Sequence, residues 1–518
     1  KGDAVTIFST TRYEWGVLDF ALAAIGAVNV PIYDTDSATQ AERILNDSDV
    51  KLAIADNRER FDRLDSVIDR CPSLKHILML DSNAMGALEG LGVTVSDEEL
   101  EARIDSVHAD DLATIVYTSG STGAPKGAEL SHRNFISITR AGSLALHEII
   151  LEDHPRLLLF LPLAHCFARF IQYASIASDD GVVGYLPDTK TLLPDLRSFE
   201  PTYLLGVPRV FEKVYNAASR KAGMGWKGRL FLKAAEAARD WSRMQQAGEK
   251  PTMKQTAEHL SYEASVYRTV RGALGPRIRY VACGGAPLDV SLAHFFNGIG
   301  LPMIQGYGMT ECTPLISGTP QSAKERYRKA GSVGVPVRAG QVRIVGRDEN
   351  GIGEILFRGP NVMLGYYDMP EETAKALSPD GWLSTGDLGF EDKDGWIYLT
   401  GRKKNVIVTK TGENVYPEEL EAYVNDSPYV SDSMVFTSMR NNEETVGVQI
   451  LPDMEFIQEV TGKIPDEDEL YRMMKKVIGE INENLASYKR IRDVFVRKED
   501  FTRTTTKKIR RQDNLEIR

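Results

Sequence analysis

Several features that would indicate particular classes of protein are missing from this sequence of 518 residues. No apolar run approaches the roughly 18 residues that suggest a membrane-spanning helix, and no secretory signal peptide is visible. The net charge is -11, whereas domains that bind nucleic acid are usually basic, so no nucleic-acid partner is expected. We therefore expect a cytoplasmic protein, and leave open a peripheral contact with the inner face of the membrane.

Cysteine is also scarce. The four cysteines lie far apart in apolar surroundings, and none forms a Cys-x-x-Cys pair: Cys71, Cys166, Cys283 and Cys312. This distribution gives no indication of a zinc site or a disulfide framework, and favours buried free thiols in a reducing compartment. The chain opens on Lys1-Gly2-Asp3 and enters a predicted strand at once, so we expect that residues are missing upstream.

The sequence does contain a loop rich in glycine and hydroxyl side chains, directly after a predicted strand at residues 114–117. The loop reads Thr118-Ser119-Gly120-Ser121-Thr122-Gly123-Ala124-Pro125-Lys126-Gly127. Glycines let backbone N–H groups face one anion, while the hydroxyls and Lys126 add donors and charge. The spacing is not that of a P-loop, because Pro125 stands where the second glycine should be. The pattern predicts a polyphosphate-binding loop.

Strands alternate with helices from residue 5 to residue 107, which predicts βαβ units and a largely parallel sheet. After the loop, Ser131 is expected to cap a helix whose positive end would add to the phosphate site. Residues 217–270 have a helical pattern, interpreted as a structural insertion in preference to an amphipathic membrane surface. Between residues 331 and 365 the sequence predicts short strands joined by turns.

Five motifs in order resemble those of the adenylate-forming superfamily, which includes acyl-CoA synthetases, luciferases and peptide-synthetase adenylation domains. They are the loop already described, Cys283-Gly284-Gly285-Ala286-Pro287, Gly306-Tyr307-Gly308-Met309-Thr310-Glu311, Ser384-Thr385-Gly386-Asp387, and the segment from Phe501 to Ile509. The resemblance implies an α/β fold with a large N-terminal domain, residues 1–401, of parallel-rich α/β subdomains and a β-subdomain. A hinge at 402–404 and a small mobile C-terminal α+β domain, residues 405–518, would follow.

The resemblance also implies one shared site for ATP and Mg²⁺. Phosphate contacts are expected from Thr118, Ser119, Gly120, Ser121, Thr122, Gly123, Lys126 and Thr310. The base is expected against Gly284, Gly285, Ala286, Gln305, Gly306, Tyr307 and Gly308. Asp387 and Arg402 match the residues that hold the ribose, and Glu311 with Thr118 match those at the metal.

The last motif carries the family's catalytic lysine, in the pattern Leu-Pro-Lys-Thr-x-x-Gly-Lys-Ile. Lys508 matches that lysine by its spacing to Thr504 and Ile509. Thr502, Arg503 and Lys507 depart from the pattern, so Lys507 stays open as an alternative.

Two further segments resemble the long-chain fatty acyl-CoA synthetases: Pro162-Leu163-Ala164-His165-Cys166-Phe167-Ala168-Arg169 and Gly206-Val207-Pro208-Arg209-Val210-Phe211. There the histidine, matched by His165, lies near the carboxylate of the acid. The implied reaction joins a fatty acid to ATP as an acyl-adenylate and then to coenzyme A. Alternatives are ligation of an aryl or medium-chain acid, loading of a carrier protein, or a non-catalytic nucleotide-binding scaffold. A homodimer is left open.

Overall fold

The computed structural model describes residues 1–118, 125–145, 154–178, 180–223, 225–320, 329–409, 413–440, 443–504 and 508–515. Two compact units are present. The first comprises residues 1–342, 357–383 and 393–397, and the second comprises residues 343–356, 384–392 and 398–518. The domain boundaries and the hinge implied by the resemblance stay a prediction.

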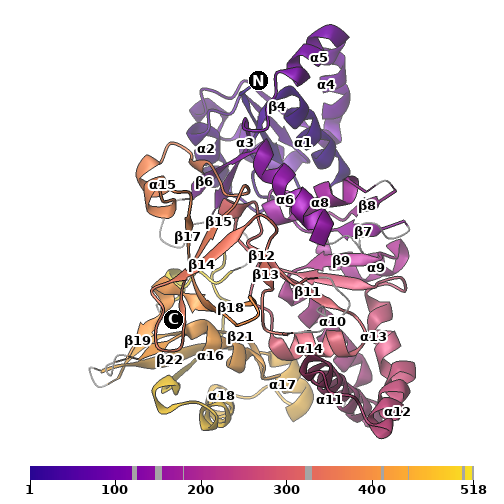
Figure 1. Ribbon diagram of the computed structural model, residues 1–518, viewed down its shortest axis with the longest axis vertical. Coiled ribbons are helices and arrows are strands. Elements are labelled where there is room, and N and C mark those ends of the chain that lie inside the picture. Colours follow the sequence, from indigo (N-terminus) through magenta and orange to yellow (C-terminus); the bar gives the residue numbers. More distant parts are fainter. Residues whose placement is uncertain are drawn as a thin grey trace. The chain divides into compact units, whose positions relative to one another are not determined.

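The first unit contains a seven-stranded sheet with the order β16-β6-β5-β2-β1-β3-β4. Two of its strands, β6 and β4, are labelled in Figure 1. The strands are β1 (Ala4–Phe8), β2 (Val28–Asn29), β3 (Leu52–Ala55), β4 (His76–Met79), β5 (Leu112–Thr118), β6 (Lys126–Ser131) and β16 (Gly365–Tyr366). The accompanying helices are α1 (Tyr13–Ile25), α2 (Ala38–Asp47), α3 (Arg58–Asp65), α4 (Ala84–Gly92), α5 (Asp97–Asp105) and α6 (His132–Ala145). The five strands β1 to β5 pair in parallel, as the alternating pattern predicts.

A second seven-stranded sheet of this unit has the order β13-β12-β11-β10-β9-β7-β8. Its strands are β7 (Arg156–Leu159), β8 (Val182–Tyr185), β9 (Tyr203–Gly206), β10 (Tyr280–Cys283), β11 (Met303–Tyr307), β12 (Ser317–Gly318) and β13 (Val335–Pro336). The helices around it are α8 (Cys166–Ile176), α9 (Leu192–Phe199), α10 (Pro208–Ala222), α11 (Trp226–Ala247), α12 (Met253–Tyr262), α13 (Arg268–Ala273) and α14 (Val290–Gly298). Residues 217–270 are thus largely helical, as predicted.

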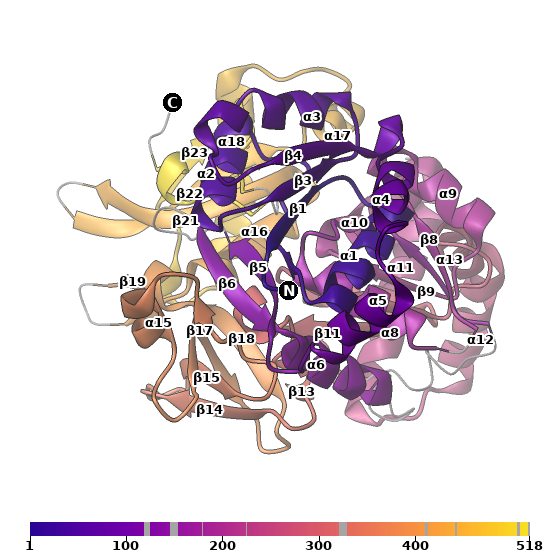
Figure 2. The same cartoon turned by 90° about the horizontal axis from the view of Figure 1, so that it is seen from above.

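Alternating strand side chains build apolar layers on both faces of each sheet. In β1, Ile7 packs in a core with Trp15 of α1 and with residues of β7 and α8, whereas Phe8 packs in the core beneath α2 and α3. In β9, Leu205 joins the first of these cores and Leu204 packs in the core below α10, α11 and α14. Helices α1 and α8 therefore lie between the two sheets, as the view in Figure 2 lets the reader follow.

The predicted helix that Ser131 caps is present, but a strand separates it from the glycine-rich loop, so the expected contribution of the helix end to the phosphate site is wrong. β5 and β6 form an antiparallel hairpin in which Thr118 pairs with Lys126. Helix α6 begins only at His132, after the whole of β6, where the Asn134 backbone N–H donates to Ser131 Oγ at 3.3 Å. Ser131 does cap the helix, but the helix dipole acts at the far end of the hairpin from the loop.

The second unit contains a three-stranded sheet with the order β21-β22-β23. Its elements are α16 (Pro417–Asn425), β21 (Val430–Arg440), β22 (Glu443–Pro452), α17 (Met454–Thr461), α18 (Glu467–Glu483) and β23 (Asp493–Val496). A core with Leu420, Val448 and Ile478 at its centre holds the helices on the sheet. The pair β19 (Ile407–Val408) and β20 (Asn414–Val415) precedes it.

A four-stranded sheet, β14-β15-β17-β18, completes the fold. Its strands are β14 (Gln341–Val345), β15 (Gly353–Arg358), β17 (Leu383–Glu391) and β18 (Ile397–Arg402). All four cysteines are buried and free, which confirms that prediction. Within the described ranges, no helix has both the length and the apolar character needed to cross a membrane.

Candidate functional site

The candidate site in the first unit is centred on Tyr366, which connects Lys126 to Glu311. The Tyr366 hydroxyl donates to Glu311 Oε1 at 2.8 Å, and Lys126 Nζ lies 5.1 Å from the centroid of the same ring. Strand β16 pairs with β6 and sets Tyr366 opposite Ala128, while the 3-10 turn that carries Glu311 lies against β6. The structure therefore brings together the predicted phosphate lysine and the predicted metal carboxylate.

Lys126 also has a carboxylate partner that the motifs did not identify. Its Nζ pairs with Glu372, in the first turn of α15 (Pro370–Ala376), and Lys375 Nζ lies 2.5 Å from Glu372 Oε1. Hydrogen bonds from Lys126 and Lys375 lower the pKa of Glu372 to about 2, so this carboxylate is charged at neutral pH. The lysine predicted to bind phosphate is thus paired with a charged carboxylate of the protein itself.

Glu311, the predicted metal ligand, is buried, and its turn is held by hydrogen bonds. It is 8 % exposed, and its carbonyl accepts from Met363 N–H at 2.8 Å. Asn361 Nδ2 steadies the turn by donating to the carbonyl of Leu315 at 2.8 Å. In the part of the chain that the structure describes, no cluster of three or more His, Cys, Asp or Glu could hold a metal ion alone. A hard cation at Glu311 fits if substrate phosphates supply its other oxygen ligands.

The two segments predicted to hold the base lie at one edge of the second sheet. Gly284 to Ala286 follow β10, and Gln305 to Gly308 end β11, its parallel neighbour. Only glycine fits at position 308, where a Cβ would lie 1.9 Å from the Pro314 oxygen. A Cβ on Gly284 would lie 2.9 Å from Phe167 Cζ, so the phenyl ring would have to shift. The carboxyl ends of parallel strands are where ligands bind in such sheets.

His165 lies next to this edge at the start of α8. Its Nδ1 accepts from Phe167 N–H at 3.1 Å and so caps the helix. One turn later, Arg169 is buried and donates to Asp19 Oδ1 at 2.7 Å, an ion pair that fixes α8 against α1. The contact of Phe167 with Gly284 places the histidine motif beside the predicted base segment, while the role of His165 toward an acid stays a prediction.

Asp387 and Arg402, both predicted to hold a ribose, are paired in the second unit. Arg402 Nε lies 2.9 Å from Asp387 Oδ1, with side chains that are 42 % and 10 % exposed. The Asp387 backbone N–H donates to Thr385 Oγ1 at 3.0 Å, which shapes the turn. Burial, then the charges of Arg402 and Arg511, lower the pKa of nearby Lys404.

The residues on either side of 505–507, in the segment with Lys508, pair with each other in the same unit. Arg503 and Ile509 make an antiparallel bridge, and Thr504 N–H donates to the Lys508 carbonyl at 2.8 Å. The side chain of Lys508 is exposed. Six predicted site residues lie outside the described residues: Ser119, Gly120, Ser121, Thr122, Gly123 and Lys507. The phosphate contacts of the loop, and the choice between Lys507 and Lys508 as the catalytic lysine, therefore stay predictions.

Comparisons with known families agree with these motifs. A family model described as "AMP-binding enzyme" matches residues 1–367, and one described as "AMP-binding enzyme C-terminal domain" matches residues 404–517. The long-chain-fatty-acid–CoA ligase FadD15 of Mycobacterium bovis is 42% identical over 84% of this chain and 71% of its own length. Long-chain-fatty-acid–CoA ligase 1 of Cavia porcellus is 29% identical, and the match spans 87% of this chain and 66% of that protein.

Solved structures share the fold. MatB from Rhodopseudomonas palustris with bound ATP has a TM-score of 0.69 at 23% identity, covering 99% of this chain and 88% of that chain. The o-succinylbenzoate coenzyme A synthetase MenE from Bacillus subtilis, in complex with ATP and magnesium ion, has a TM-score of 0.70 at 20% identity, covering 99% and 89%. These likenesses confirm the predicted fold class. With both family models matched and a relative 42% identical over most of its length, this chain belongs to the AMP-binding, adenylate-forming enzymes.

Proposed function

We propose that this protein is a long-chain-fatty-acid–CoA ligase that works in two steps. A fatty acid carboxylate attacks the α-phosphate of ATP, giving an acyl-adenylate and pyrophosphate. The thiol of coenzyme A then attacks the acyl carbonyl, giving the thioester and AMP. The names of the relatives support this substrate and acceptor, and the observation that carries the proposal is the Lys126–Tyr366–Glu311 cluster.

The main obstacle to the first step is electrostatic, since a carboxylate must approach a triphosphate. Lys126 would bind phosphate oxygens at the exit of the glycine-rich loop, with Thr118 at its entrance. Glu311 would hold Mg²⁺, whose contribution is to neutralise charge on the phosphates. By donating to one oxygen of Glu311, Tyr366 would keep this carboxylate in one orientation.

The remaining residues would bind the nucleoside and the acid. The Asp387 carboxylate can accept hydrogen bonds from ribose hydroxyls, with Arg402 holding it in place. Tyr307 and the glycines of both β-strand ends would pack on adenine, and His165 would orient the acid. Lys508 would supply positive charge for adenylation and be dispensable for thioester formation, with residues 402–404 as the hinge between these two states.

Pyrophosphate release, measured with butyrate, benzoate, octanoate and palmitate, with and without coenzyme A, tests the proposal. The proposal expects the highest kcat/KM with palmitate and a palmitoyl thioester only when coenzyme A is present. Faster reaction with benzoate or octanoate would favour the aryl or medium-chain alternative, and a product formed on a carrier protein but not on coenzyme A would favour carrier loading. No release with any acid would favour the scaffold.

A further inference from the structure

A run of positive charge in this acidic chain extends from the second half of α10 into the first half of α11. Residues 213–235 contain six Lys or Arg residues and no Asp or Glu, although the net charge of the whole chain is -11. The outward side chains of this region form what we call the basic patch: Lys221, Trp226, Lys227, Arg229, Leu232 and Lys233. All six are exposed.

Two large apolar side chains stand among these cations. Trp226 is 66% exposed and Leu232 is 59% exposed. Helix α11 has its own buried face, on which Phe231, Ala234 and Ala238 pack in the core shared with α14. Trp226 and Leu232 therefore do not belong to the core that α11 shares with α14, and their side chains face solvent.

The charge of the basic patch is not neutralised by neighbouring carboxylates. Further along α11, Arg243 lies 3.3 Å from Glu236 and 2.9 Å from Asp240. By contrast, no carboxylate of the described residues lies within ion-pair distance of Lys221, Arg229 or Lys233. Lys227 Nζ lies 5.7 Å from the centroid of the Trp226 ring. The second half of helix α11 therefore pairs its charges internally, whereas the first half exposes its positive charge to solvent.

We propose that the basic patch docks this protein on a membrane surface that contains anionic phospholipid. Lys and Arg side chains near such a surface each gain attraction to the headgroups, while tryptophan and leucine favour the boundary between headgroups and acyl chains. An acidic protein would be attracted by the same charges, but exposed Trp226 and Leu232 favour a lipid interface. The proposed docking is inferred from the positive charge and the exposure of the basic patch. Only the purpose of the docking, to collect a fatty acid from the bilayer, rests on the proposed function.

Flotation with vesicles of phosphatidylcholine, with or without phosphatidylglycerol, tests the docking without any turnover. The wild type should float with the anionic vesicles and not with the neutral ones, and 0.5 M salt should weaken its binding because the charges are exposed. Lys227→Glu/Lys233→Glu should lower the partition coefficient at least about tenfold. The matched control is Lys475→Glu/Lys476→Glu in α18, which changes the net charge equally at two exposed positions and should bind anionic vesicles like the wild type.

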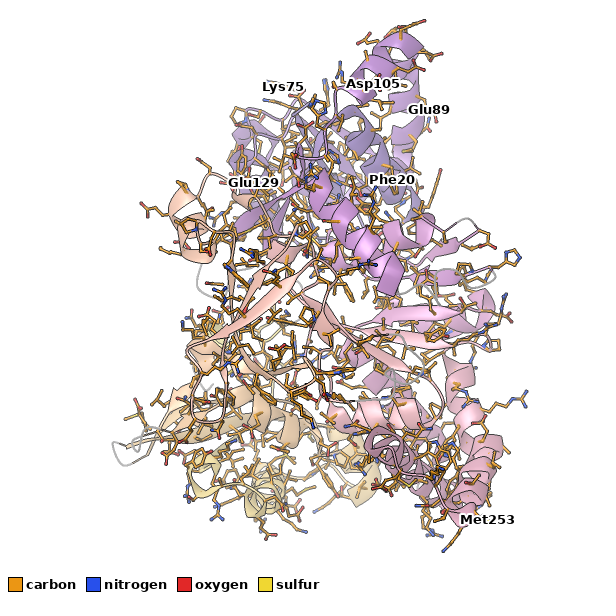
Figure 3. All side chains as sticks on the ribbon, in the orientation of Figure 1. Phe20, Lys75, Glu89, Asp105, Glu129 and Met253 are labelled. Carbon is orange, nitrogen blue, oxygen red and sulfur yellow. The ribbon has the colours of Figure 1, made fainter. Side chains whose placement is uncertain are left out.

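The apolar contribution has its own control. Trp226→Ala should lower vesicle binding severalfold, whereas Met253→Ala, at a side chain that is 92% exposed and projects from α12 (Figure 3), should leave it unchanged. Circular dichroism checks that each variant is folded. Absence of wild-type binding to anionic vesicles, equal loss in both double variants, or binding to an acidic protein alone would overturn the inference. Ligase activity on dispersed acid is scored separately, and its failure would count against the proposed function only.

Discussion

The Tyr366 hydroxyl donates a hydrogen bond of 2.8 Å to Glu311 Oε1. Burial, and then the charge of Glu311, raise the pKa of Tyr366, so the hydroxyl keeps its proton and remains a donor across the physiological range. One oxygen of a buried carboxylate is therefore held by a neutral donor. This relationship makes Tyr366 a positioning residue for the candidate metal carboxylate.

Tyr366→Phe removes this donor while keeping the ring beneath Lys126. We expect kcat/KM for ATP to fall by about 10- to 100-fold, because a hydrogen bond to a charged group contributes about 1.5–3 kcal/mol. The Mg²⁺ concentration for half-maximal activity should rise as well, which a loss of stability alone would not cause. Tyr367→Phe, one residue along, is the control and should keep the Mg²⁺ dependence of the wild type; an unchanged Mg²⁺ dependence in Tyr366→Phe would contradict the positioning role.

Glu372→Gln removes the anion that pairs with Lys126 in the structure. If ATP phosphate must take the place of this carboxylate, KM for ATP should fall by about two- to fivefold, in line with the small free energy of an exposed ion pair. Steady-state kinetics against ATP check the value, with Glu371→Gln as the neighbouring control. A higher KM would mean that Glu372 orients Lys126 for ATP instead of competing with ATP.

Lys508→Ala separates the two half-reactions. Adenylation should slow by at least about 100-fold, because a cation that stabilises developing charge is lost. Conversion of supplied acyl-adenylate and coenzyme A to thioester should stay within severalfold of the wild type. The same two assays on Lys507→Ala decide between the adjacent lysines, and Lys498→Ala, at an exposed lysine of the same unit, is the control. Equal loss of both steps in Lys508→Ala would be inconsistent with a role confined to adenylation.

Asp36 should make the stability of the first unit depend on pH. Burial raises its pKa to about 6, against a partial opposing effect of the hydrogen bond from Tyr33 N–H. Since the folded pKa lies above the unfolded one, the folded state binds the proton more tightly. This contribution to the free energy of unfolding is complete below about pH 4 and is lost, by about 2 kcal/mol, as the pH rises to about 6.

Denaturant unfolding of the wild type and of Asp36→Asn between pH 4 and pH 7 checks this expectation. The difference between the two proteins should grow in favour of Asp36→Asn with rising pH. Asp65→Asn, at an exposed position of α3, should follow the wild type. A pH-independent difference would show that Asp36 does not titrate in this window.

The parts of the site that could be predicted are those with local motifs. The apolar run at residues 114–117 predicts a strand that leads into the glycine-rich loop, and the structure confirms it as β5. The pairing of Asp387 with Arg402 agrees with the shared ribose role that the resemblance implies. For these parts of the site, short sequence motifs are enough to predict the residues involved.

The parts that could not be predicted depend on contacts between distant segments. Tyr366 reaches Glu311 because β16 pairs with β6, a two-residue pairing with no local signature. Likewise, residues 126–131 form a strand because β5 offers them an antiparallel edge, whereas the sequence predicts only the helix that Ser131 caps after them. Helix α4 has a weak helical signal in the sequence, because glycines at 86, 90 and 92 lower its helix propensity.

The central claim, that a fatty acid carboxylate attacks the α-phosphate of ATP, is tested most directly by following the carboxylate oxygen into the products. Palmitate labelled with heavy oxygen at its carboxyl group is incubated with ATP, Mg²⁺, coenzyme A and the protein, and the nucleotide product is examined by mass spectrometry. Attack of the carboxylate on the α-phosphate predicts AMP that carries one labelled oxygen, formed together with pyrophosphate and palmitoyl-CoA. Unlabelled AMP, or ADP with labelled phosphate, would contradict an acyl-adenylate intermediate.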